Sequence, residues 1–211
     1  MFPDLTRDDV FRLETRRLWL RWPRQADLSA LVQLAGDKAV AEMTAQLPHP
    51  YGPEHAVDFV AHARRQNGAG CALTMAITPR SRPADLIGVV GIRASEGGRP
   101  TLGYWVGAPF WDGGFATEAA RGLIDAFFAY TENDELMASA RVVNPGSRRV
   151  LEKCGFTHAG SGLEAFPARG GVFPVDHFRL DRRKWASFKA WGTADYIPRP
   201  REPEIAQLCG A

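Results

Sequence analysis

The chain has 211 residues and a formal net charge of +2, from 26 basic and 24 acidic side chains. This length suits one domain. Several pairs of adjacent arginines occur, but they are scattered along the chain rather than gathered in a stripe, so no nucleic-acid partner is expected. The sequence has no run of about 18 apolar residues, so no membrane span is expected. It has no apolar leader, and its three cysteines have neither metal-ligand nor disulfide spacing. These features predict a cytoplasmic protein without a metal.

The first half of the chain predicts a strand, two helices and three further strands. Alternating residues at Arg17–Arg21 indicate the first strand. Apolar residues keep helical spacing from Asp27 until Gly36 ends the helix. Pro53 stands at the first position of the second helix. The three strands that follow are expected at Cys71–Ile77, Leu86–Arg93 and Thr101–Val106.

The second half alternates helices and strands. The predicted elements, in order, are a helix at Phe115–Tyr130, a strand at Glu135–Val143, a short helix from Asn144–Pro145 to Gly155, strands near Phe156–Leu163 and Val175–Leu180, and a helix at Arg182–Trp191. This order predicts an α/β (α+β) fold with a mainly antiparallel first half and a central strand–helix–strand unit. Residues 1–191 form the expected single domain, and residues 192–211 the expected tail.

A possible anion site lies where a predicted strand meets a predicted helix, in Trp111–Glu118 (WDGGFATE). Adjacent glycines let the backbone approach a ligand closely, and the free N–H groups at a helix N-terminus favour a phosphate. Ala116 is small enough to keep the approach open, and the Thr117 hydroxyl adds a donor. On these residues alone, a plain Gly-Gly turn is an equally good interpretation.

A wider segment, Leu102–Arg121, resembles the acetyl-CoA signature of the GNAT superfamily, in the branch that includes ribosomal-protein N-terminal acetyltransferases. Asn144–Ser147 with Val150–Phe156, and the loop Leu47–Tyr51, agree with it. The resemblance implies a GNAT fold: a mixed, mostly antiparallel sheet with a splayed central strand and about four flanking helices. It also implies that acetyl-CoA is the co-substrate and that its pyrophosphate is held by the amides of Gly113, Gly114, Phe115 and Ala116.

One residue departs from this pattern. The branch usually has glycine where Asp112 stands, and an acidic side chain beside a pyrophosphate would repel it. We therefore expect Asp112 to face solvent or a nearby arginine.

The resemblance also assigns an acyl site. Trp105 and Val106 match the interrupted central strand, and the Val106 amide would polarise the thioester carbonyl. No tyrosine occupies the family's usual acid position in the short helix. Asn144 would instead bind the pantetheine arm and Ser147 would lie near the sulfur, although both residues also suit helix capping.

Three residues are candidates for the general base. Thr101 occupies the strand position where relatives often carry a carboxylate. Glu164 lies in the region where the terminal-acetylating branch places an acidic base, and His49 and Glu42 are alternatives. The absence of an obvious base favours an acceptor amine of low pKa, such as an α-amine near pKa 8.

The sequence therefore predicts an N-acetyltransferase that transfers the acetyl group directly to a protein N-terminal α-amine or a small-molecule amine in a ternary complex. No cysteine lies at a predicted acyl position, and Cys154 is expected in the core. The alternative is a non-catalytic domain that binds or senses acyl-CoA. A homodimer is a further expectation, because exposed sheet edges are often covered by pairing.

Overall fold

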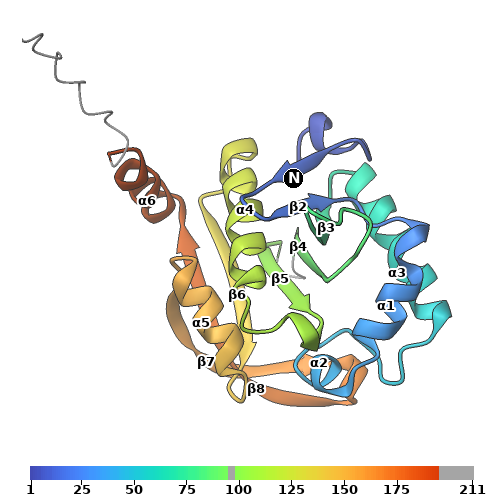
Figure 1. The fold of residues 1–211 in the computed structure, drawn as a ribbon. Helices are drawn as coiled ribbons and strands as arrows, with labels where there is room; N and C mark the ends of the chain where they lie inside the picture. Colours follow the sequence, from blue (N-terminus) through green and yellow to red (C-terminus); the bar gives the residue numbers. More distant parts are fainter. Residues whose placement is uncertain (95–97, 195–211) are drawn as a thin grey trace, which may run out of the picture.

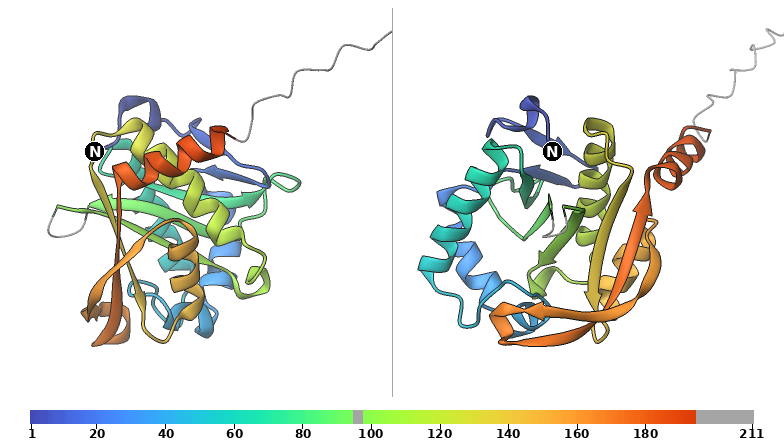
Figure 2. Two further views of the ribbon diagram at one scale, coloured as in Figure 1. Left: turned by 90° about the vertical axis from the view of Figure 1, so that its left-hand side faces the viewer. Right: turned by 180° about the vertical axis from the view of Figure 1, so that it is seen from behind.

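The computed structural model describes residues 1–94 and 98–194. Eight strands form one sheet in the order β1-β2-β3-β4-β5-β6-β8-β7. Neighbouring strands are antiparallel except β5 and β6, which are parallel. Figures 1 and 2 show α1 and α3 on one side of the sheet and α4 on the other, with α5 and α6 beside α4.

The strands are β1 (Arg12–Glu14), β2 (Leu18–Arg21), β3 (Ala72–Pro79), β4 (Gly88–Ala94), β5 (Pro100–Val106), β6 (Glu135–Arg141), β7 (Thr157–Phe166) and β8 (Gly171–Asp181). The α-helices are α1 (Leu28–Ala35), α2 (Lys38–Glu42), α3 (Pro53–Gly68), α4 (Phe115–Tyr130), α5 (Pro145–Lys153) and α6 (Arg182–Ala194). This mixed α/β architecture is the predicted fold class. The unit β5–α4–β6 is the strand–helix–strand unit predicted for the middle of the chain.

Alternation along the strands builds two hydrophobic cores, because successive side chains of a strand point to opposite faces. On β4, Val90 packs into the core beneath α4, while Val89 packs with α1 and α3. On β5, Leu102 and Val106 belong to the first core and Trp105 packs against the second. The Trp105 side chain is therefore directed away from the α4 side of the sheet.

The two parallel strands separate soon after they meet. β5 and β6 are in register only at Thr101 opposite Met137 and Leu102 opposite Ala138. Beyond these pairs, the end of β5 stays with β4, and the end of β6 stays with β8. The central splay implied by the sequence resemblance is therefore present, and it lies next to the N-terminus of α4.

The sequence prediction missed two short elements, the three-residue strand β1 and the helix α2. The six α-helices of the described residues exceed the four or so expected around the sheet. At the C-terminus, α6 continues to Ala194, three residues beyond the predicted domain boundary at Trp191. The rest of the predicted tail, residues 195–211, lies outside the described residues. Among the described helices, none has the length and apolar character needed to cross a membrane.

Candidate active site

The turn before α4 exposes backbone amides at the start of the helix. Gly114 adopts a left-handed conformation with φ of 74° and provides no side-chain cap. The first intrahelical bond runs from the Glu118 N–H to the Gly114 carbonyl, so the preceding N–H groups have no partner within the helix. A Cβ built on Gly114 would meet only the Arg17 Nη2, at 3.5 Å. The backbone at this position is therefore open to a ligand, as an anion-binding site requires. We call Gly113–Thr117 the cradle.

Asp112 adopts a left-handed conformation, with φ of 56°. Aspartate tolerates this region better than most residues, which explains how it replaces the usual glycine. Its side chain is exposed and forms no ion pair with any other described residue. The expectation that Asp112 faces solvent is therefore confirmed.

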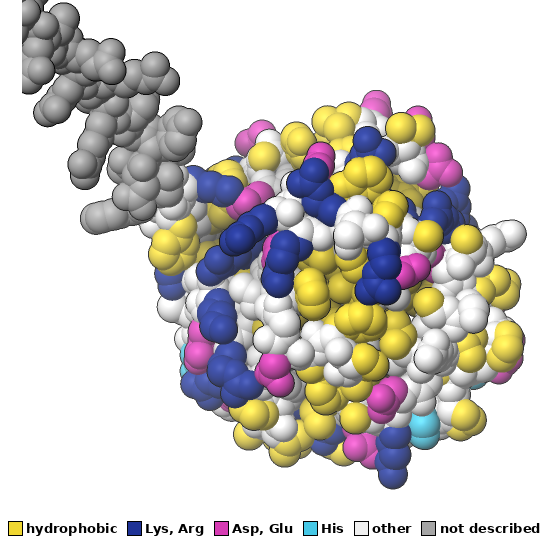
Figure 3. Space-filling model, in the orientation of Figure 1, with side chains coloured by type: hydrophobic (Ala, Val, Ile, Leu, Met, Phe, Trp, Pro, Cys, Tyr) yellow, Lys and Arg dark blue, Asp and Glu magenta, His cyan; other side chains and the backbone are white. Residues whose placement is uncertain are grey.

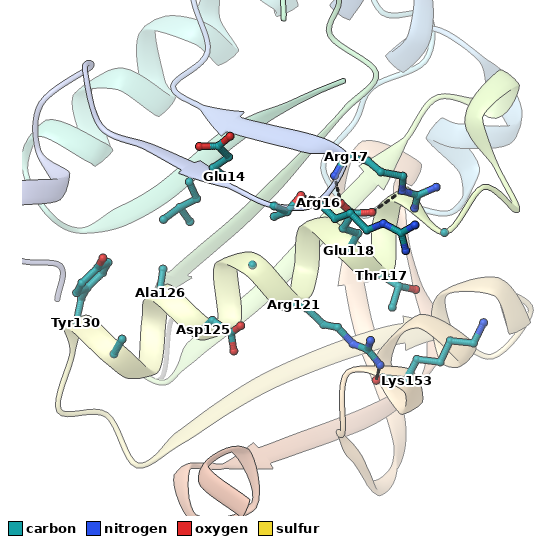
Figure 4. A pocket seen from close by; sticks show the side chains of 15 residues that line it. Glu14, Arg16, Arg17, Thr117, Glu118, Arg121, Asp125, Ala126, Tyr130 and Lys153 are labelled. Carbon is teal, nitrogen blue, oxygen red and sulfur yellow. Dashed lines mark hydrogen bonds and ion pairs between the residues drawn. The ribbon is translucent and has the colours of Figure 1, made fainter. Parts of the chain in front are cut away.

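Arg17, in the turn between β1 and β2, fastens the cradle to the sheet. Its backbone N–H and its Nε both donate to the Glu118 carboxylate, each at 2.6 Å. Its Nη1 donates to the Gly113 carbonyl at 3.0 Å, and its guanidinium lies 4.6 Å from the centre of the Phe115 ring. Figure 4 shows Arg17 and Glu118 joined across the gap between the turn and α4. No sequence pattern predicts this contact, because its partners are about a hundred residues apart.

Glu118 is held in its charged form by these contacts. Burial by itself would raise the pKa of the Glu118 carboxyl, but hydrogen bonds from Thr15 and Arg17 outweigh burial and lower the pKa below its usual value. The charged carboxylate also lies in the first turn of α4, where it is favoured by the helix dipole. Both effects keep the Arg17–Glu118 pair intact at neutral pH.

The Val106 amide faces the splay. The next N–H along the chain, of Gly107, donates to Ile87, next to β4. Because N–H groups alternate in direction along a strand, the Val106 N–H points the other way, toward the side that β6 leaves open. On that side, Trp111 Nε1 donates to the Val106 carbonyl at 2.7 Å. Val106 thus combines a buried side chain with a backbone directed into the splay.

Ser147 has a partner that the sequence analysis missed. The Tyr104 hydroxyl, on β5, lies 2.9 Å from Ser147 Oγ and 3.1 Å from the Ser147 carbonyl oxygen, on α5. This contact spans the two sides of the splay. Burial raises the pKa of Tyr104 well above its ordinary value, so the phenol stays protonated. The alternation of side chains along β5 places Tyr104 on the same face as Val106, which was the available sequence signal.

Asn144 caps α5, as the alternative interpretation predicted. Its Oδ1 accepts a hydrogen bond from the Ser147 N–H at 2.9 Å. Its Nδ2 group has no hydrogen-bond partner among the described residues, and the side chain is half-buried. Capping therefore uses the Oδ1 atom of the Asn144 amide and leaves its Nδ2 group available to a ligand.

Glu164 reaches the open edge of β6. Its side chain extends from β7 across β8, and its Oε2 accepts a hydrogen bond from Ser139 Oγ at 2.9 Å. Ser139 is the first residue of β6 beyond the last pair with β5. The other carboxylate oxygen lies 3.3 Å from His177 Nδ1. The carboxylate is about one third exposed, so it is accessible beside the splay.

The remaining candidates lie in less specific surroundings. Glu42 is paired with Lys38 at 3.7 Å, and His49 is exposed, with no partner among the described residues. Cys154 is buried, as predicted. Burial raises the pKa of the Cys154 thiol to about 12, which disfavours the thiolate that a nucleophile needs.

Comparison with known proteins agrees with this geometry. Residues 17–157 match the family model described as an acetyltransferase (GNAT) domain. The uncharacterised N-acetyltransferase p20 of Bacillus licheniformis is 28% identical over 176 residues, which cover 82% of this chain and 98% of that protein. The proposed ribosomal N-acetyltransferase YdaF of Bacillus subtilis (strain 168) is 31% identical over 88 residues, 42% of this chain and 48% of that protein.

Solved structures show the same fold. RimJ of Mycobacterium smegmatis, in complex with CoA-disulfide, superposes with a TM-score of 0.71 at 19% identity, covering 91% of this chain and 98% of that one. The splayed sheet and the uncapped N-terminus of α4 lie within the span that matches the family model. The chain therefore belongs to the GNAT family and is an acetyl-CoA-dependent acetyltransferase.

Proposed function

We propose that the protein transfers the acetyl group of acetyl-CoA to a primary amine, either a protein N-terminal α-amine or the amine of a small molecule, by direct attack in a ternary complex. The observation that carries this proposal is the juxtaposition of an open amide cradle, a splayed β5–β6 pair and an accessible carboxylate at the β6 edge. The buried, protonated thiol of Cys154 argues against an acyl-enzyme on that residue.

Seven residues would hold the donor, acetyl-CoA, which carries the acetyl group as a thioester. Backbone amides of Gly113, Gly114, Phe115 and Ala116, with the Thr117 hydroxyl, suit the pyrophosphate. The Asn144 Nδ2 group suits an amide of the pantetheine arm. Trp105 would contribute only its backbone, because its side chain packs on the opposite face of the sheet.

Three residues would act on the thioester. The Val106 N–H donates to the carbonyl oxygen, where negative charge develops as the amine nitrogen attacks. When the carbon–sulfur bond breaks, the leaving thiolate takes a proton. The Ser147 hydroxyl, supported by the Tyr104 phenol at 2.9 Å, would supply it, so the pair replaces the tyrosine missing from α5.

Glu164 would take the proton that the acceptor amine loses. Ser139 and His177 each hold one of its oxygens, which fixes the direction of the carboxylate. A carboxylate is a weak base, so it suits an amine of low pKa better than a lysine side chain. This preference, together with the similarity to ribosomal-protein acetyltransferases, supports an α-amine as the acceptor. The cytoplasmic location, the homodimer and the absence of a nucleic-acid partner stay predictions.

An acceptor screen tests the function. We expect thiol release from acetyl-CoA to accelerate in the presence of peptides with free α-amines, and less with polyamines, amino acids or aminoglycosides. N-terminally blocked peptides carrying internal lysine serve as the control. Tight acetyl-CoA binding with no thiol release from any amine would contradict the proposal and support a sensing domain instead.

Replacement of the proposed base tests the mechanism. We expect Glu164→Gln to lower kcat by about 10²- to 10⁴-fold, the range for loss of a general base. The KM for acetyl-CoA should not change, since Glu164 lies away from the cradle. The defect should shrink as the pH rises toward the pKa of the amine, because more of the acceptor is then already deprotonated.

Glu135→Gln is the matched control, because Glu135 is also a partly exposed carboxylate of the same sheet and is paired with Arg179 at 3.7 Å. It should keep wild-type kcat. Wild-type kcat for Glu164→Gln at every pH would remove Glu164 from the mechanism.

A further inference from the structure

A groove runs along α4 from the cradle. It has a volume of about 720 Å³ and lies between the β1–β2 turn, the exposed side of α4 and the C-terminal end of α5. Gly114 and Thr117, two residues of the proposed cradle, line one end of it. Figure 4 shows the side chains that project into this space from the three elements.

The carboxylates that line the groove each have a cation of their own. Glu14 is paired with Arg80 at 2.6 Å, and Glu118 is paired with Arg17. Asp125 is paired with Lys189 at 2.5 Å. None of them is left to balance another positive charge in the groove.

Three cations of the groove have no such partner. Arg16, Arg121 and Lys153 all line it, and none of them forms an ion pair with a carboxylate in the described part of the chain. Arg121 is instead oriented by a hydrogen bond from its Nη2 to the Lys153 carbonyl. Figure 3 shows lysine and arginine side chains gathered on the side of this face where α4, α5 and α6 lie. The groove therefore carries an excess of positive charge and suits an anion.

Arg121 lies one helical turn beyond the cradle, and Arg16 and Lys153 line the same groove from the β1–β2 turn and the end of α5. Thr117 and Arg121 are four residues apart on α4, so they project from the same face at a spacing of about 6 Å. A ribose that carries a 5′-linked pyrophosphate and a 3′-phosphate separates its two anionic groups by a comparable length. A pyrophosphate on the Gly114 amide and the Thr117 hydroxyl would thus direct a second phosphate toward Arg121 and Lys153.

We propose that Arg16, Arg121 and Lys153 bind the ribose 3′-phosphate of coenzyme A, so that the protein discriminates against donors without it. The inference rests on the proposed function, because it takes the pyrophosphate to be in the cradle. A phosphate monoester carries nearly two negative charges at neutral pH. Hydrogen bonds from arginine and lysine to such a group are stronger than hydrogen bonds between neutral groups.

Titration calorimetry of the full chain with coenzyme A and 3′-dephospho-coenzyme A tests the proposal. We expect the dephospho form to bind about a hundredfold more weakly, since each contact with a charged group is worth about a factor of ten. Lys153→Met and Arg16→Met should each weaken binding of coenzyme A about tenfold and leave binding of the dephospho form unchanged. A merely structural role would weaken both ligands alike.

Arg183→Met is the matched control, because Arg183 is an exposed cation of α6 that does not line the groove. It should leave both affinities unchanged. Equal affinities of the wild-type protein for the two coenzymes would overturn this inference alone. If neither coenzyme binds and no amine is acetylated, the proposed function fails together with it.

Discussion

Gly114→Glu is expected to lower kcat/KM for acetyl-CoA by at least about a hundredfold. Two like charges about 4 Å apart near a protein surface repel each other by about 4 kcal/mol, which corresponds to nearly a thousandfold, and solvent reduces this value. The space beside Gly114 is open apart from Arg17, so the new carboxylate would occupy the proposed pyrophosphate position rather than disturb the core. Steady-state kinetics with acetyl-CoA as the varied substrate measures the effect.

The chain offers a closely matched control for backbone strain. Gly98 has φ of 75° against 74° for Gly114, and a side chain there would meet nothing within 4 Å. Gly98→Glu therefore imposes the same conformational cost and the same charge away from the cradle. It should keep wild-type kinetics. Full activity of Gly114→Glu would show that the turn before α4 does not hold the coenzyme.

Local sequence patterns were sufficient for the elements that form the cradle. Helix α4 begins at Phe115 and ends at Tyr130, as predicted, because Gly113 and Gly114 precede it and Ala119, Leu123 and Phe127 then repeat at helical spacing. The break after Val106 was equally visible in Gly107 and Pro109. The part of the site that would hold acetyl-CoA could be predicted because most of it is contiguous in sequence. Only the residues of α5 come from elsewhere in the chain.

Local patterns were not sufficient for the contacts that orient the catalytic side chains. Tyr104 and Ser147 are 43 residues apart, and Ser139 and Glu164 are 25 apart. Each contact depends on how two strands or a strand and a helix diverge at the splay, and this geometry leaves no periodic signal. The contact between His177 and one oxygen of Glu164 leaves no sequence signal for the same reason.

The short elements were missed for a different reason. β1 has three residues and α2 has five, so neither spans enough of the chain for alternation or helical spacing to be recognised. Both are stabilised by tertiary contacts. β1 pairs with β2 through Leu13 opposite Leu20, and the carbonyl of Glu42, the last residue of α2, accepts a hydrogen bond from Arg141 on β6.

The largest effect on stability is expected from Arg21→Met. Asp27 is fully buried, and its two carboxylate oxygens accept hydrogen bonds from Arg21 at 2.7 and 2.8 Å. Removal of one partner of a buried ion pair typically costs about 3–5 kcal/mol, because the other charge stays buried. Arg24, at 3.9 Å, compensates in part, so we expect about 3 kcal/mol, the low end of that range. Chemical denaturation measures the free energy of unfolding.

Two further variants show whether the stability lost in Arg21→Met comes from the unpaired buried charge of Asp27 or from lost packing. Arg21→Met with Asp27→Asn removes both charges and should be more stable than Arg21→Met alone, because no unpaired carboxylate is left buried. Lys38→Met removes a cation from an exposed pair with Glu42 and should cost about 0–1 kcal/mol. If the double variant is no more stable than Arg21→Met, the cost lies in the packing of the Arg21 side chain. The link between the end of β2 and the start of α1 would then depend on shape rather than on charge.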